Sequence, residues 1–163
     1  MNVKDVLKYG HRSLTSALND FPVSAVETPG ACGVWSVKNI VEHLASYEWV
    51  LVDVFNSLLG VGSTPYLDRF VQEHLTFNDS EVDRRQGQSF DQSVAEYQEA
   101  HDKVMALAGQ IPPPTYRQLN VLPWYGTAYD LEDFIVYTFY GHKREHMAQI
   151  AAFRDIVLRQ DGA

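Results

Sequence analysis

The sequence predicts an all-α fold, a four-helix bundle in which one connection between helices is long. Four segments of the 163-residue chain repeat apolar residues at helical spacing, and no segment shows the alternation of a β-strand. About thirty residues separate the second segment from the third, far more than adjacent antiparallel helices need. A connection of this length lets those two helices run parallel, so we expect up-down-down-up order in a single domain, residues 1–163.

The first helix is expected to begin near Val3 and to end before Pro22, which cannot continue it. The second is expected to begin after Ser36, a good N-cap, and to end near Leu59, before Gly60. Both segments carry an apolar stripe, made in the first by Val3, Val6, Leu7, Leu14 and Leu18, and in the second by Val37, Ile40, Val41, Leu44, Leu51, Phe55 and Leu58.

The long connection covers residues 60–88, in which PYLDRFVQEHL favours a short helix whereas NDSEVDRRQGQS is polar and rich in turn-forming residues. A third helix is expected over residues 90–108. The fourth is expected to open with a capping box from Thr127 to Asp130 and to continue to about residue 158. Its apolar face is formed by Leu131, Ile135, Thr138, His142, Ile150, Phe153 and Val157, with His146 alongside.

Charge and cysteine content narrow the classes of function. The chain has 13 Lys and Arg against 21 Asp and Glu, a formal net charge of -8, which disfavours nucleic-acid binding. The single cysteine, Cys32, cannot form an internal disulfide and fits a reducing compartment. The N-terminal segment carries charges every few residues, and the apolar runs are too short to cross a bilayer. We therefore expect a cytoplasmic protein with no membrane partner.

His142 and His146 are the strongest candidates for chemistry. Four residues return a helix nearly to the same face, so both rings can reach one point, as two ligands of a divalent metal do. Both lie on or beside the apolar face, where an unpartnered polar ring costs a few kcal/mol. The alternative is a pair of core histidines that are hydrogen-bonded to tyrosines, for which Tyr129, Tyr137 and Tyr140 are near enough in sequence.

A third metal ligand has to come from another helix. His43 is the best candidate, because it lies on the shoulder of the second helix's apolar stripe, beside Leu44 and Tyr47. His101, on the apolar seam of the third helix, is the rival candidate. His11 and His74 have no supporting pattern. A lone histidine on an apolar face is also often a hydrogen-bonded core residue, so spacing alone leaves the choice open.

Two motifs together resemble the DinB/YfiT-like superfamily of metalloenzymes. They are W-S-x-K-x-I-x-x-H-L, from Trp35 to Leu44, and the later H-x-x-x-H of residues 142–146. The resemblance implies an up-down-down-up bundle and a three-histidine site at His43, His142 and His146 for a divalent ion, Zn or Ni most commonly. It also implies a homodimer, as in many members of the superfamily.

Three imidazoles with an open coordination position are typical of catalytic metal sites rather than structural ones. The open position suits either water, for hydrolysis, or a low-molecular-weight thiol, for thiol-dependent transfer. Small-molecule substrate contacts are expected from Trp35, Tyr47, Trp124 and Tyr125, for which loop packing is the alternative explanation. The sequence names no catalytic side chain. The competing class of function is a non-catalytic bundle that binds a metal or a ligand.

Overall fold

The computed structural model describes residues 2–161 and confirms the predicted all-α class, because helices are the only extended regular elements in that range. The long helices are α1 (Val3–Asn19), α2 (Val37–Leu59), α5 (Phe90–Ala108) and α7 (His142–Asp161). Shorter ones connect them: η1 (Val23–Ala25), α3 (Pro65–Glu73), η2 (His74–Thr76), α4 (Phe77–Asp83), η3 (Pro113–Arg117), α6 (Leu131–Ile135) and the π-helical η4 (Val136–Gly141). No helix within the described range is both long and apolar enough to cross a membrane.

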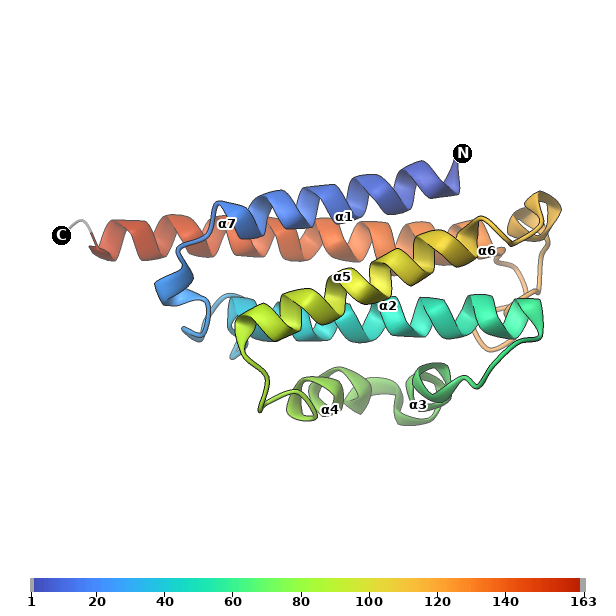
Figure 1. The fold of residues 1–163 in the computed structure, drawn as a ribbon, viewed down its shortest axis with the longest axis horizontal. Helices are drawn as coiled ribbons and strands as arrows, with labels where there is room; N and C mark the ends of the chain where they lie inside the picture. The colour runs from blue at the N-terminus through green and yellow to red at the C-terminus, as the bar shows by residue number, and fades with distance from the viewer. Residues whose placement is uncertain (1, 162–163) are drawn as a thin grey trace.

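The long helices lie side by side along the molecule (Figure 1). α2 packs mainly against α5, and α1 packs mainly against α7. The backbones of α2 and α7 come close to each other at few positions. In Figure 1 the chain runs in one direction along α2 and α5 and in the opposite direction along α1 and α7. α3 and α4 cover the outer side of α2, so the long connection forms an additional wall beside it.

Capping side chains fix where the main helices begin. Ser36 and Ser89 each accept a hydrogen bond from a backbone N–H and form a capping box, at the start of α2 and α5. The fourth helical segment also begins with a capping box, but at a different residue from the one expected. Asp130, not Thr127, is the N-cap, because its carboxylate accepts from the N–H of Asp133. Residues up to Tyr129 therefore belong to the preceding loop.

The polar half of the long connection is more ordered than its composition indicates. Residues 77–83 form α4, in which Phe77, Glu81 and Val82 are buried. Arg69 and Arg85 contact the Glu81 carboxylate at 2.7 and 2.8 Å. Charged pairs across the connection thus compensate for the burial of its polar side chains, which composition alone does not reveal.

The core consists of two apolar clusters with polar side chains between them. One cluster includes Leu7, Leu51 and Phe134, and the other includes Leu14, Ile40 and Phe153. On each long helix the residues between these clusters include histidine or charged side chains. We call this set the polar layer: His11, His43, Glu48, His101, His142, Lys143 and His146. The site described below lies in this layer.

Candidate metal centre

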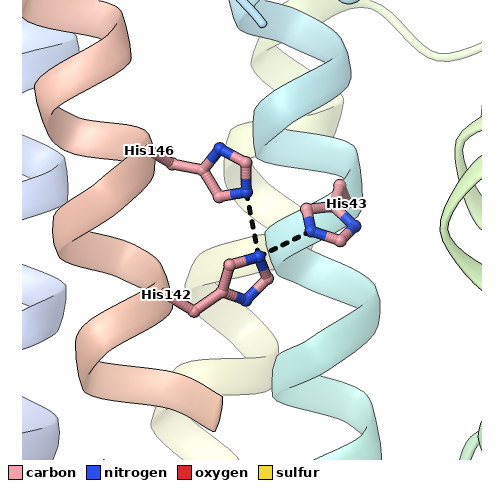
Figure 2. Close-up of side chains that lie close together, drawn as sticks. All are labelled: His43, His142 and His146. Atoms are coloured by element: carbon pink, nitrogen blue, oxygen red, sulfur yellow. Dashed lines mark hydrogen bonds between the residues drawn. The ribbon is translucent and has the colours of Figure 1, made fainter. Parts of the chain in front are cut away.

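The structure brings His43, His142 and His146 together (Figure 2). His43 extends from α2, and the other two extend from successive turns of α7 toward it. The Nε2 atom of His142 lies 2.8 Å from Nε2 of His43 and 2.9 Å from Nε2 of His146. His43 and His146 are buried, and His142 is partly buried. We call these residues the three-histidine cluster.

Hydrogen bonding alone does not account for this arrangement. A ring nitrogen carries one hydrogen or one lone pair in the ring plane, so Nε2 of His142 cannot form a well-directed hydrogen bond with both neighbours. A cation that receives all three lone pairs satisfies the three atoms together. Nitrogens bound to tetrahedral zinc lie about 3.4 Å apart, and the three ligand atoms here all lie within 4.8 Å of one another. The donor set therefore fits a divalent ion.

Electrostatics keep the three rings in the form that binds metals. Burial, followed by the proximity of His142 and His146, holds the pKa of His43 well below its ordinary value. Burial and the neighbouring His146 lower the pKa of His142 to about 3. Burial also lowers the pKa of His146. Neutral imidazole is the species that coordinates metal ions, so the lone pairs are available at neutral pH.

Two of the three rings are oriented by contacts from their own helix. The His146 Nδ1 atom lies 2.8 Å from Oε1 of Gln149. The main chain of Thr138 accepts a hydrogen bond from the His142 ring, and this bond partly offsets the lowering of the His142 pKa. Such bonds fix the tautomer and direct the opposite nitrogen toward the metal. The Nδ1 atom of His43 is buried and has no hydrogen-bond partner in the described chain.

The helical segment that carries His142 changes its winding just before this residue. Residues Val136–Gly141 form the π-helix η4, and α7 begins at His142. π-helical turns occur frequently at functional sites, because the extra residue re-aims the side chains that follow. The carbonyl of Thr138, which contacts the His142 ring, belongs to this turn.

Neither His101 nor the three tyrosines considered as hydrogen-bond partners belong to the three-histidine cluster. His101, the rival third ligand, is not in the cluster, and its Nδ1 atom instead contacts Oε2 of Glu48 at 3.0 Å. In the described chain, no hydrogen bond joins Tyr129, Tyr137 or Tyr140 to a histidine of the cluster. Tyr129 and Tyr137 are 45% and 62% exposed, so they do not serve as core partners.

The expected substrate-contact residues fall into two groups. Tyr47 lies against the cluster, with its ring centroid 4.6 Å from that of His142 and 4.8 Å from that of His43. Trp124 and Tyr125 line a cavity on the other side of Tyr47. Trp35 packs on His43 at 4.9 Å and lines neither of the two cavities beside the cluster.

A cavity of about 270 Å³ reaches His142, and Tyr47, Thr138 and Glu145 are among its other lining residues. Sequence reasoning missed Thr138 and Gln149 as orienting residues, although T-x-x-x-H and H-x-x-Q spacings were visible. It also missed Phe70 and Asn78, which the long connection brings beside Tyr47. No local spacing predicts that approach.

The fold and the cluster define a class of protein: an all-helical chain in which two long helices contribute three convergent histidines. Comparison with family models gives the family, since residues 7–150 match the DinB superfamily, and the chain belongs to it. No curated protein and no solved structure matches the chain significantly.

Proposed function

We propose that this protein is a divalent-metal-dependent enzyme that acts on a small molecule. The observation that carries the proposal is that three ring nitrogens lie within 4.8 Å of one another, with a cavity that reaches His142. Membership of the DinB superfamily supports the same function. His43, His142 and His146 are the ligands, and the ion is Zn or Ni.

The reaction class follows from an incomplete ligand set. The cluster contains no fourth His, Cys, Asp or Glu among the described residues, so a coordination position is left for an exogenous group. When bound, the ion supplies Lewis acidity, which serves either hydrolysis by water or transfer of a low-molecular-weight thiol. The chain itself supplies the walls: Tyr47 closes one side of the cluster, and the polar groups of Thr138 and Glu145 face the cavity beside His142.

The bundle topology belongs to the same proposal. We assign the up-down-down-up order to α1, α2, α5 and the segment from α6 to α7, in one domain. The parallel course of α2 and α5 in Figure 1 and the long connection between them support this order. A homodimer in the cytoplasm is the expected working form.

The first test is metal content. Protein purified without added metal, analysed by inductively coupled plasma mass spectrometry, should contain one Zn or Ni per chain. His142→Ala and His43→Ala should reduce the bound metal to below about a tenth of that value, because two ligands rarely retain a labile ion. His74→Ala is the matched control, since His74 is exposed and outside the cluster. Unchanged metal content in His142→Ala would refute the assignment.

The second test separates an enzyme from a binding protein. The metal-loaded protein is assayed against neutral esters and against a thiol with an electrophilic acceptor. Turnover that His142→Ala abolishes supports the enzyme. Stoichiometric metal with no turnover in either assay supports the alternative, a non-catalytic bundle that sequesters metal or ligand.

A further inference from the structure

A second cavity lies beside the three-histidine cluster, on the far side of Tyr47. It encloses about 390 Å³, within the range of small-molecule sites. Its walls come from three parts of the chain: Tyr47 on α2, Phe70, His74 and Asn78 on the long connection, and Trp124 and Tyr125 on the loop before α6. α7 contributes no residue to this cavity, whereas α2, which carries His43, contributes Tyr47.

Aromatic rings dominate this cavity and hold each other in edge-to-face contact. The Phe70 ring lies 5.6 Å from Tyr47 at 79° and 6.0 Å from Trp124 at 80°. Trp124 in turn lies 6.2 Å from Tyr125 at 67°. Rings at right angles present faces and edges in different directions, so an added planar ring finds both kinds of partner.

The polar groups of the cavity are the Tyr47 hydroxyl, the Asn78 amide, the Trp124 indole N–H, the Tyr125 hydroxyl and the His74 imidazole, which lies at its exposed rim. The Tyr47 hydroxyl donates to Oδ1 of Asn78 at 3.1 Å. The amide nitrogen of Asn78 has no hydrogen-bond partner in the described chain and is available as a donor. No Lys or Arg lines this cavity or the one at His142, and Glu145 lines the latter, so an anionic group would be desolvated there without a fixed positive partner.

The backbone at the rim of the cavity is strained. His74 has φ 47° and ψ -112°, a conformation that non-glycine residues rarely adopt. The next residue, Leu75, also lines the cavity and is 96% exposed. Strain of this kind costs about 1–3 kcal/mol and is concentrated at ligand sites, where the surrounding structure maintains it.

Tyr47 connects this cavity with the candidate metal centre. It lines both the 390 Å³ cavity and the 270 Å³ cavity that reaches His142. A molecule whose ring lies against Phe70 and Trp124 therefore also contacts the Tyr47 side chain that packs against His142. We propose that the 390 Å³ cavity binds a neutral, planar aromatic group of the substrate, which carries a hydrogen-bond acceptor for Asn78. This substrate class rests on the proposed function, in which the reaction takes place at the three-histidine cluster.

Three matched probes test the chemistry of the cavity by isothermal titration calorimetry. Acetanilide is a neutral aromatic amide, N-cyclohexylacetamide is its saturated counterpart, and 4-acetamidobenzoate is its anionic counterpart. We expect acetanilide to bind about tenfold more tightly than either analogue, because only it combines ring contacts with neutrality. Equal or tighter binding of the saturated or anionic probe overturns the proposal, and so does failure of acetanilide to bind at millimolar concentration.

Two variants locate the binding. Trp124→Leu and Phe70→Leu should each weaken acetanilide binding about five- to tenfold, since each removes one ring contact. Trp49→Leu is the matched control, because Trp49 lines a different cavity, between α2 and α5. Loss of binding in Trp49→Leu but in neither cavity variant places the probe elsewhere and overturns the proposal.

Metal content, measured on the same samples, keeps the two proposals separate. The cavity variants should retain the wild-type metal stoichiometry, because neither Trp124 nor Phe70 belongs to the cluster. If wild-type protein binds no metal but Trp124→Leu still selectively loses acetanilide, the proposed function fails while the aromatic cavity stands. If metal binds and acetanilide shows no preference, only the substrate class fails.

Discussion

Gln149 and Thr138 show how single residues prepare the candidate metal centre. A histidine can bind metal through either nitrogen, and the partner of the other nitrogen decides which one is free. Gln149 contacts Nδ1 of His146, and the Thr138 carbonyl receives the hydrogen bond of the His142 ring. Each contact leaves Nε2 facing the neighbouring rings, as the short Nε2 contacts show.

Replacing Gln149 by leucine should therefore weaken metal binding without abolishing it. Loss of such an orienting partner typically costs 10–100-fold in affinity. A competition titration with a chromophoric zinc chelator measures the change. Gln98→Leu is the control, because Gln98 is exposed on α5 and pairs with Asp102. Identical affinities for the two variants would show that the contact at His146 does not orient the ring.

The lowered pKa of His11 should make the free energy of unfolding decrease in acid. Burial, then the nearby His101 and Lys143, lower its pKa to about 4, and Glu48 and Asp102 only partly oppose this shift. The Tyr97 hydroxyl also contacts its ring, at 3.3 Å. In the unfolded chain His11 takes up a proton near its ordinary value of about 6.5. The unfolded state thus binds more protons between pH 6.5 and 4, so stability falls as pH falls through that window.

His11→Gln should remove the part of this acid-dependent loss of stability that protonation of His11 causes. Because His11 is partly exposed, we expect the share to be about 1–2 kcal/mol rather than the full value of the shift. The measurement is urea unfolding of metal-free protein at pH 7 and pH 4.5, compared between wild type and variant. If the difference in unfolding free energy between wild type and His11→Gln is the same at both pH values, protonation of His11 does not cause the loss of stability in acid.

Sequence reasoning found the cluster residues but not their surroundings, and the reason is physical. The i, i+4 spacing of His142 and His146 is a local property of a helix, so the sequence displays it. The place of His43 on a helix face and the family resemblance favour it over His101 as the third member. Contacts such as Tyr47 with Asn78 depend on how the long connection packs, which is a non-local property.

At the scale of elements, the fourth helical segment departs most from a simple periodic pattern. The sequence indicated one continuous helix, but the structure divides it into α6, the π-helix η4 and α7. Leu131 and Ile135 are buried before the π-helical turn, and His146 and Ile150 are buried after it. One extra residue in a helical turn shifts the spacing of apolar residues only slightly, so the apolar pattern of this segment remains compatible with a single helix.

Lys143, the residue after His142, connects α7 to α2. Its Nζ atom forms an ion pair with Oε1 of Glu48 at 2.5 Å, and both side chains are almost completely buried. Burial raises the pKa of Glu48, but Lys143 and the hydrogen bond with His101 outweigh it and lower the pKa to about 2. The carboxylate is therefore charged within the polar layer.

Lys143→Met should destabilise the fold by about 3–5 kcal/mol, because it leaves a buried charge without its partner. Adding Glu48→Gln should recover part of the loss, since glutamine removes the charge and retains an acceptor for His101. Urea unfolding of both variants and of wild type gives these values. If the double variant is no more stable than Lys143→Met, the cost comes from lost packing rather than from the unpaired carboxylate.

For the whole molecule, the polar layer crosses the bundle between its two apolar clusters. α2 packs mainly on α5, and α1 packs mainly on α7, so contacts across the layer have to join the two helix pairs. The Glu48–Lys143 ion pair and the three-histidine cluster are two such connections, and the contact of His11 on α1 with Tyr97 on α5 is a third. A buried polar layer of this kind favours one register of the helices, because a shift would leave its members unpaired.

Metal binding should therefore stabilise the whole fold, because the ligands come from both helix pairs and the site does not exist in the unfolded chain. With free zinc at about 100 times the dissociation constant, the gain is about 2.7 kcal/mol. For a chain of this size that raises Tm by about 5–10 °C. Differential scanning calorimetry with zinc and with chelator measures the rise. His142→Ala should lose it, and His74→Ala should keep it. An equal rise in both variants would mean that zinc binds outside the cluster.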